Sequence, residues 1–407
     1  MRQLRGVAQP FPTRRLLNEI AAYETCEASG RNGGLRVVDN ISTDLAIVGA
    51  GIAGAGLAAE LAADFDVVLI ERESRPGYHS TGRSAAIFIQ NYGNAAIRAL
   101  NRASRPLFEA ADPELFPNPL LSQRGMLTVA DADGLPALRS LLTQSEGLKE
   151  ISVEEACAKF PLLRRDRLLA AAYEHDAQDI DVAALHQGWL KKAKANGAKL
   201  LTNADVADGE RVSGRWRIET NAATIDANYI INAAGAWADR LAATCGLPPL
   251  GIQPMRRTIA VLPAPSDYDT RHWPLVDDAA ERWYMKPETG RLLVSPADED
   301  PVEPHDAFVD DMVLAEGLDR FEQAVTLPVT RVESRWAGLR SFAPDRTPVA
   351  GFDKTVDGFF WLAGLGGYGV QISPALSRLA GQLIRRASIS DDLALIVPAL
   401  SPNRFRT

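Results

Sequence analysis

The chain has 407 residues, of which 46% are hydrophobic and 24% charged, and its formal net charge is −8. This composition is typical of a soluble globular protein long enough for two domains, and the acidic balance gives no reason to expect nucleic acid or an anionic membrane as a partner. The three cysteines are widely separated and the five histidines are scattered, so the sequence predicts a reducing, cytoplasmic compartment and no metal site.

Residues 1–42 are predicted to form a flexible N-terminal extension, with an over-long translation start as the alternative. They carry six arginines and show little apolar periodicity. No apolar run leads to a small-residue cleavage site, so a secretory signal is not expected.

The stretch TDLAIVGAGIAGAGLAAELAADFDVVLIER, residues 43–72, predicts a strand, a glycine turn, a helix and a second strand that ends at an acid. Gly49, Gly51 and Gly54 have the GxGxxG spacing, which allows a tight turn, a close approach of the backbone to a pyrophosphate, and close helix packing. Glu71 follows the second strand, where a carboxylate accepts a ribose hydroxyl. The sequence therefore predicts a dinucleotide-binding unit.

The alternative for this stretch is a membrane helix, because residues 45–63 are almost wholly apolar and long enough to span a bilayer. The clustered glycines and Glu60 argue against that alternative. The acid-terminated strand that follows at the expected distance favours the dinucleotide unit.

The remaining elements are predicted from apolar spacing, capping residues and β-rich alternation. Helices are expected over residues 94–110, 135–145, 153–160, 181–196 and 311–324. Strands are expected over residues 126–130, 199–202, 215–219, 229–232, 257–262, 282–286, 291–294 and 347–351. The loop after Arg72 is rich in glycine and serine, and it is expected to enter a helix around Ser84.

The pattern of strand, glycine turn and helix returns in NAAGAWADRLA and in FFWLAGLGGYGVQISPALSRLAGQLI. The predicted fold class is therefore α/β, with a discontinuous Rossmann-type dinucleotide-binding domain of the glutathione-reductase-like kind and an inserted β-rich α+β substrate domain. The first domain is assigned residues 43–125, 181–250 and 341–407. The second domain is assigned residues 126–180 and 251–340.

From residue 43 onward, the motifs GAGIAGAG, NAAGAWAD and AGLGGYGVQISPALSRLAG together resemble those of the FAD-dependent glycine/D-amino acid oxidase family. Within that family, several segments are most similar to those of the D-arginine dehydrogenases. These segments are PGYHSTGRSAA, RRDRLLAAAYEHDAQDIDVAALHQGWL, LGIQPMRRT, WAGLRSFAPD and GGYGVQ. The resemblance implies FAD as the cofactor and a D-amino acid or related amine as the substrate.

The residues expected to hold FAD lie mainly in the glycine turns and the STGRSAA loop. Glycines let the backbone approach the flavin, and the helix from Val370 would direct its positive end at the reduced ring. The resemblance assigns to the cofactor Gly49, Gly51, Ala53, Gly54, Glu71, Arg72, Ser80, Thr81, Arg83, Ser84, Ala85, Ala86, Val206, Gly235, Gly367, Tyr368, Gly369, Val370 and Gln371. FAD is expected to be non-covalent because no cysteine follows Cys245; His79 is the alternative point of attachment.

An amino-acid substrate needs a cation that fixes its carboxylate, and a bidentate arginine suits this role. The resemblance assigns Arg340 and Arg257 to the carboxylate, and it places Tyr92, Tyr284 and Tyr368 around the substrate. The alternatives are surface ion pairs for the arginines and a core position for Tyr284.

Two positions depart from the D-arginine dehydrogenase pattern. Ile87 stands where that pattern has a histidine, and the segment around Met126 has no carboxylate where the pattern has a glutamate. A buried guanidinium would lack its counter-charge there. Ile87, Met126 and Gly367 are assigned to the side-chain pocket, which is therefore expected to prefer less basic, more apolar D-amino acids or another small amine.

The predicted reaction is oxidation of the Cα–N bond of a D-amino acid, with hydride passing from Cα to flavin N5 and the imino acid hydrolysed to a 2-oxo acid and ammonia. The alternatives are a glycine/sarcosine-type oxidase that produces hydrogen peroxide, an NAD-dependent dehydrogenase, and a flavin-binding protein without catalysis. The electron acceptor (a quinone, a carrier or oxygen) stays open. A quinone would imply a position peripheral to the inner membrane, with no transmembrane segment.

Overall fold

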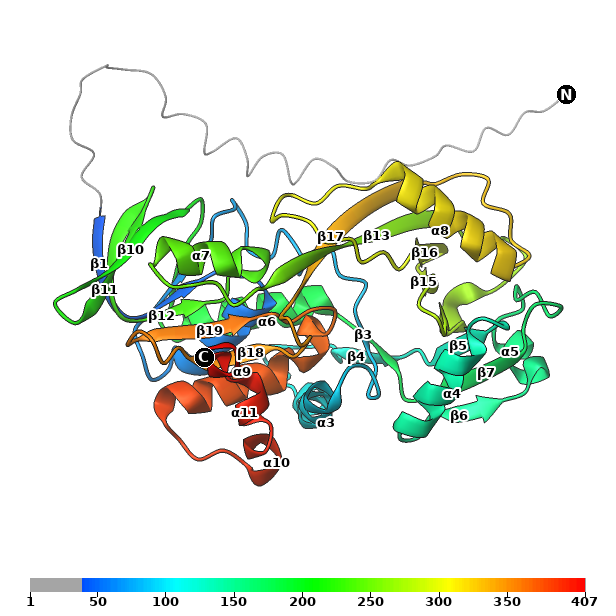
Figure 1. Cartoon of the computed structure of the whole chain (residues 1–407), viewed down its shortest axis with the longest axis horizontal. Coiled ribbons are helices and arrows are strands. Elements are labelled where there is room, and N and C mark those ends of the chain that lie inside the picture. Colours follow the sequence, from blue (N-terminus) through cyan, green and yellow to red (C-terminus); the bar gives the residue numbers. More distant parts are fainter. Residues whose placement is uncertain (1–38, 407) are drawn as a thin grey trace, which may run out of the picture. The chain divides into compact units, whose positions relative to one another are not determined.

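The computed structural model describes residues 39–406, and the chain from Asp39 onward forms one compact unit. Two large sheets, a small third sheet and the helices packed against them make up this unit (Figure 1). Residues 1–38 of the expected extension lie outside the described part of the chain.

The first large sheet has a parallel core extended by antiparallel strands (Figure 1). Its strands are β1 (Asp39–Val48), β2 (Val67–Ile70), β9 (Lys199–Leu201), β10 (Val206–Val212), β11 (Arg215–Thr220), β12 (Ala223–Asn232), β18 (Val349–Phe352) and β19 (Phe359–Ala363). The parallel core has the order β9–β2–β1–β12–β19. Strand β18 pairs with β19, and the β10–β11 hairpin pairs with β12, both in antiparallel fashion.

Helices cover both faces of this sheet, which explains why its central strands are apolar throughout. Along β1, Leu45 and Ile47 belong to one core, and Ala46 and Val48 belong to the other, as the alternation of a strand requires. The first core also holds residues of α2 (Ile52–Leu61), α3 (Ala95–Glu109), α6 (Val182–Ala195) and α9 (Gly369–Arg385). The second core holds residues of α7 (Ala238–Thr244).

Glycines allow α2 to pack unusually close to its neighbours. A Cβ on Gly54 would lie 1.9 Å from the carbonyl oxygen of Gly49, in the turn that leads into the helix. A Cβ on Gly56 would lie 2.4 Å from Ser377 Oγ of α9 and 2.8 Å from the Trp189 ring of α6. The helix is therefore fixed on the sheet and between its two neighbouring helices.

The second large sheet is mixed and joins segments that are far apart in the sequence. Its strands, in spatial order, are β6 (Lys149–Ile151), β7 (Ala170–Glu174), β5 (Met126–Ala130), β14 (Leu275–Asp278), β15 (Tyr284–Glu288), β16 (Arg291–Ser295), β13 (Gln253–Pro263) and β17 (Ser334–Phe342). The parallel pair β5–β14 connects its two halves. One face packs on α5 (Val153–Lys159) and α8 (Asp311–Ala324) through a separate apolar core.

Short elements complete the described chain. The third sheet consists of β3 (Ile87–Phe88), β8 (Gln178–Ile180) and β4 (Leu121–Gln123), in that order. The other helical segments are α4 (Leu135–Gln144), α10 (Asp391–Ala394), α11 (Val397–Leu400), η1 (Gly235–Trp237), η2 (Thr270–His272) and η3 (Pro402–Phe405).

The structure confirms the predicted α/β fold class. The helices expected over residues 94–110, 135–145, 153–160, 181–196 and 311–324 are present, with ends within one residue of those expected. The expected helix around Ser84 is wrong, because the chain runs there through turns and loop into β3. The expected boundary of the extension is also wrong: residues 39–42 are part of β1 because they pair with residues 223–226 of β12. The division into two domains stays a prediction.

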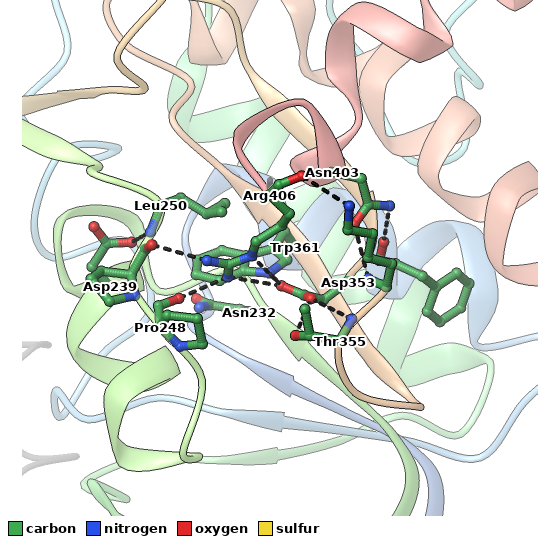
Figure 2. A network of polar contacts seen from close by, with 12 residues as sticks. Asn232, Asp239, Pro248, Leu250, Asp353, Thr355, Trp361, Asn403 and Arg406 are labelled. Carbon is green, nitrogen blue, oxygen red and sulfur yellow. Dashed lines mark hydrogen bonds and ion pairs between the residues drawn. The ribbon is translucent and has the colours of Figure 1, made fainter.

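A buried polar network ties the C-terminal segment to the first sheet (Figure 2). Asp353 accepts hydrogen bonds from Trp361 Nε1 at 3.0 Å, Arg406 NH2 at 2.9 Å and Thr355 Oγ1 at 2.6 Å. Arg406 also donates to the carbonyl oxygen of Pro248 at 2.7 Å. Burial alone would raise the pKa of Asp353, but the bonds from Thr355, Arg406 and Trp361 hold it below its usual value.

We expect Asp353→Asn to lower the free energy of unfolding by about 1–3 kcal/mol, because Arg406 loses its buried counter-charge. Since the folded-state pKa of Asp353 is depressed, its contribution is present above the unfolded pKa of about 4 and is lost as the pH falls through the folded pKa. Urea unfolding at neutral and acidic pH measures both effects. The exposed Asp357→Asn serves as the control, and equal stability of the two variants would contradict the prediction.

Candidate active site

The two large sheets enclose a cavity of about 590 Å³. Val48, Ile70 and Ala233 line it at the carboxyl ends of β1, β2 and β12, which is where open α/β sheets bind ligands. The wall on the opposite side comes from the second sheet, including β13 and β17. Most residues of the GxGxxG turn and most of the predicted substrate residues therefore face a common space.

The N-terminus of α2 opens on this cavity without a side-chain cap of its own. Thr81 Oγ1, from the following loop, accepts a hydrogen bond from the Ile52 amide at 2.9 Å. Glu71 is 7% exposed, and its Oε2 accepts a hydrogen bond from the Ala50 amide at 3.1 Å. The helix N-terminus and the buried carboxylate have the geometry that binds a pyrophosphate and a ribose hydroxyl.

The loop of residues 77–86 is pinned between the two sheets. Ser80 Oγ donates to the carbonyl oxygen of Leu339 at 2.6 Å. Arg83 NH1 donates to two carbonyl oxygens, those of Ala307 and Ala337, at 3.0 Å each. The backbone of this loop lines the cavity, while the end of the Arg83 side chain is held by the second sheet and its connecting loops.

One end of the cavity is aromatic and basic. The Arg72 guanidinium lies 4.9 Å from the centre of the Trp237 ring, and the His79 ring packs on Trp237 at 4.6 Å between centroids. His79 Nε2 is also 2.9 Å from Glu73 Oε1. Trp237 lines the cavity near Val206 and was not predicted from the sequence, although it stands within the NAAGAWAD motif.

A second helix N-terminus, that of α9, reaches the cavity through Gly369 and Val370. Gln371 is buried, where its Oε1 accepts from the Ile89 amide at 3.1 Å and its Nε2 donates to Asn101 at 3.0 Å. Gly367 lies against Arg340, since a Cβ there would be 2.9 Å from Arg340 NH1.

Arg340, on β17, lies beside a group of aromatic side chains. Its NH1 is 3.5 Å from Tyr92 Oη, at the limit of a hydrogen bond. Burial alone would lower the pKa of Arg340, but the neighbouring Tyr92, Tyr284 and Glu299 raise it. Its guanidinium therefore stays charged at the cavity wall.

Arg257, on the neighbouring strand β13, is 9% exposed. Its NH2 donates to Glu299 Oε1 at 3.0 Å, and Glu299 also pairs with Arg346 at 2.9 Å. The Nε of Arg257 is buried and has no hydrogen-bond partner among the described residues. Glu299 was not predicted from the sequence. Because it pairs with Arg257, part of the positive charge of Arg257 is already neutralised at the cavity.

Two predicted residues do not line the cavity. Tyr368 is 7% exposed and packs behind Tyr92, with 4.7 Å between ring centroids, because it precedes α9 and turns into the core. Gly54 serves the packing of α2 on the preceding turn, as its contact with Gly49 shows. The other predicted site residues all line the cavity: Gly49, Gly51, Ala53, Glu71, Arg72, Ser80, Thr81, Arg83, Ser84, Ala85, Ala86, Ile87, Tyr92, Met126, Val206, Gly235, Arg257, Tyr284, Arg340, Gly367, Gly369, Val370 and Gln371.

The cavity wall near Met126 contains acids that the sequence did not reveal. Asp277 and Asp278 of β14 line it, and so does Glu281 in the turn that follows. Strand β14 was not predicted, so the sequence could not show that it runs beside Met126. The segment around Met126 itself has no carboxylate, but β14 brings carboxylates to the same wall of the cavity.

No helix within residues 39–406 is both long and apolar enough to cross a membrane. In the same range, no group of three or more histidine, cysteine, aspartate or glutamate side chains is arranged to hold a metal ion. Cys157 and Cys245 are free thiols.

Comparison with known proteins identifies the chain's family. The family model for FAD dependent oxidoreductases, DAO, matches residues 44–383. The chain belongs to this family. The prediction that the cofactor is FAD is thereby confirmed. The alternative of an NAD-dependent dehydrogenase is wrong.

Relatives within the DAO family act on several substrates. Glycine oxidase from Geobacillus kaustophilus is 25% identical over 371 residues, which cover 86% of this chain and 95% of that protein. Human mitochondrial dimethylglycine dehydrogenase is 25% identical over 394 residues, but the match covers 88% of this chain and only 44% of the longer enzyme.

Solved DAO-family structures have the same fold. Glycine oxidase from Geobacillus kaustophilus superposes with a TM-score of 0.79 at 25% identity, covering 89% of this chain and 99% of that one. L-proline dehydrogenase from P. horikoshii gives a TM-score of 0.79 at 22% identity, covering 90% and 98%.

The cavity residues fit FAD. Gly51 leaves a cradle in which a Cβ would lie 3.2 Å from Thr81 Oγ1, close to the free amides of α2. The buried Glu71 carboxylate and the N-terminus of α9 complete a site with a ribose acceptor at one end and a positive helix end at the other.

We expect Glu71→Ala to weaken FAD binding about tenfold or more, because a charge-assisted hydrogen bond to the ribose is lost. The flavin-to-protein absorbance ratio after dialysis and titration of the apoprotein with FAD measure this effect. Glu73→Ala is the matched control, since Glu73 is two residues away and does not line the cavity. Equal FAD affinity in the two variants would show that Glu71 does not hold the ribose.

Proposed function

We propose that the chain catalyses FAD-dependent oxidation of the Cα–N bond of an amino acid, with D-amino acids as the expected substrates. The observation that supports this most strongly is the pair Arg340 and Arg257, which reach one cavity from the neighbouring strands β17 and β13. Glu299 neutralises part of this positive charge, and the carboxylate of an amino acid would balance the rest.

Bound FAD supplies the two-electron oxidation, while the protein binds and orients the substrate. Arg340 holds the carboxylate, and its contact with Tyr92 Oη at 3.5 Å limits the orientation of the guanidinium. Arg257 adds a second donor, and its guanidinium lies 5.9 Å from the centre of the Tyr284 ring. Among the described lining residues the only histidine is His79, which pairs with Glu73. In this proposal the substrate gives up its Cα hydrogen with the α-amine unprotonated.

The configuration of the substrate and the likeness to the D-arginine dehydrogenases are part of this proposal. They are supported by the motifs STGRSAA, PMRRT, WAGLRSF and GGYG, whose residues meet at the cavity. Each of these motifs contributes residues to the lining of the cavity.

A glycine-type amine oxidase is the second candidate. It is favoured by the glycine oxidase relative, which this chain matches over 95% of its length. Release of hydrogen peroxide during aerobic turnover with glycine or an N-methylated amine would distinguish this oxidase from a dehydrogenase.

We expect D-amino acids, and not their L-isomers, to bleach the flavin absorbance of the purified protein under anaerobic conditions. The reason is that a fixed carboxylate presents the Cα hydrogen of only one enantiomer to the cofactor. Bleaching by glycine and N-methylated amines alone would favour the second candidate. A yellow protein that no amine bleaches would indicate a flavin-binding protein without catalysis.

We expect Arg340→Lys to lower kcat/KM for the best substrate about 100-fold while FAD stays bound, because lysine cannot form the bidentate pair. Rapid mixing with substrate measures the rate of flavin reduction, and absorbance measures the FAD content. Arg335→Lys, on the exposed end of the same strand, is the control. A variant that keeps its FAD and its rate would exclude Arg340 as the carboxylate anchor.

A further inference from the structure

Asp277 stands on the cavity side of the second sheet, among the residues expected to contact the substrate. In the paired strands it lies directly opposite Tyr284 of β15 and next to Thr128 of β5. Leu275, two residues earlier on β14 and therefore on the same face, pairs with Met126. All of these except Thr128 line the cavity.

One oxygen of the Asp277 carboxylate lacks a hydrogen-bond partner within the described part of the chain. This atom, Oδ1, is buried and has no hydrogen-bond donor among residues 39–406. Burial raises the pKa of Asp277 to about 7, with the nearby Asp278 and Glu281 adding to the rise and a hydrogen bond from Thr128 opposing it. A carboxylate with one buried, unpaired oxygen and no positive charge beside it is unfavourable unless a ligand supplies that charge.

The charged groups around Asp277 are already engaged or are exposed. Asp278 accepts from Arg282 NH2 at 2.6 Å, and Arg282 also reaches Asp131 at 2.8 Å. Lys286, on the same face of β15 as Tyr284, is 3.0 Å from Asp179 and 3.4 Å from Glu288. Glu281 is exposed to solvent. Asp277 is therefore the acid that a bound substrate meets inside the cavity.

The two charged ends of the cavity are well separated. In the order β14–β15–β16–β13–β17, Arg257 is three strands from Asp277 and Arg340 is four strands away. Three steps of about 4.8 Å place the backbones of β13 and β14 about 14 Å apart. A substrate whose carboxylate is held by the arginine side chains reaches Asp277 with the far end of its side chain and not with its α-amine.

We propose that Asp277 binds an ammonium or guanidinium group at the far end of the substrate, so that this cavity selects basic amino acids over apolar ones of the same length. This inference rests on the function proposed above. It replaces the apolar preference expected from Met126 alone, because the counter-charge comes from the neighbouring strand β14.

The test compares D-lysine with D-norleucine, which has the same carbon chain without the terminal ammonium. Rates of anaerobic flavin reduction are measured for the holoenzyme and for Asp277→Asn, Asp277→Glu and Glu288→Gln, the last at an exposed acid of β15 outside the cavity lining. Calorimetric binding of both amino acids, measured separately, does not depend on turnover. In the unmodified protein we expect kcat/KM for D-lysine to exceed that for D-norleucine about tenfold or more.

Asp277→Asn should abolish this preference and leave the rate with D-norleucine nearly unchanged, Asp277→Glu should restore part of the preference, and the control Glu288→Gln should keep it. If D-norleucine reduces the flavin but D-lysine is no better and Asp277→Asn changes neither, this inference is wrong while the proposed function stands. If neither these two nor any other amino acid reduces the flavin, the proposed function is wrong. Calorimetry then decides the inference by whether D-lysine binds more tightly than D-norleucine and loses this advantage in Asp277→Asn.

The pH dependence of the D-lysine to D-norleucine ratio provides a test without any substitution. Because the pKa of Asp277 is raised to about 7, its carboxylate becomes charged as the pH rises from about 6 to about 8, and the ratio should rise with it. Deprotonation of the α-amine affects both amino acids and cancels in the ratio. A ratio near one at every pH would overturn the inference.

Discussion

The close contact between α2 and the turn after β1 is the constraint on which the cofactor site depends. Gly54 lies so near the carbonyl oxygen of Gly49 that no side chain fits between them, and Gly49 in turn lies against Ala233 after β12. This packing places the free amides of α2 at the carboxyl edge of the sheet. The Glu71 carboxylate and the Thr81 hydroxyl are then held by amides of the same turn. The contact between Gly54 and Gly49 therefore positions the part of the cofactor site that is expected to bind the pyrophosphate and the ribose.

The opposite wall is built differently, because its sheet carries positive charge on β17 and β13, at one edge, and negative charge on the central strand β14. Arg340 and Arg257 lie toward β17, and Asp277 lies toward β5, with Tyr284 between them. A wall with this charge distribution selects a substrate by its length and by the charge at the far end of its side chain. Glu299 moderates the positive end by pairing with Arg257 and Arg346, so the electrostatic field there is weaker than two free guanidinium groups would produce.

Local sequence signals were sufficient for the dinucleotide unit and for most helices. The helix over residues 181–196, for example, is marked by Asp181 at its start and Gly197 after its end, and the structure agrees. Local sequence patterns do not predict contacts between segments that are far apart in the chain. Strand β14 is short and pairs with β5, roughly 150 residues earlier, so neither Asp277 nor its place beside Met126 has a local signature. Glu299 was missed for the same reason.

Helix α2 packs against α9, which follows it by more than 300 residues. During synthesis on the ribosome, the apolar side of α2 therefore emerges long before its partner exists. The N-terminus of α9 is also one wall of the cofactor site, so a nascent chain cannot enclose the flavin until this helix has left the exit tunnel. We expect cofactor loading to be a late, post-translational event, and the waiting chain to depend on chaperones that shield exposed α2.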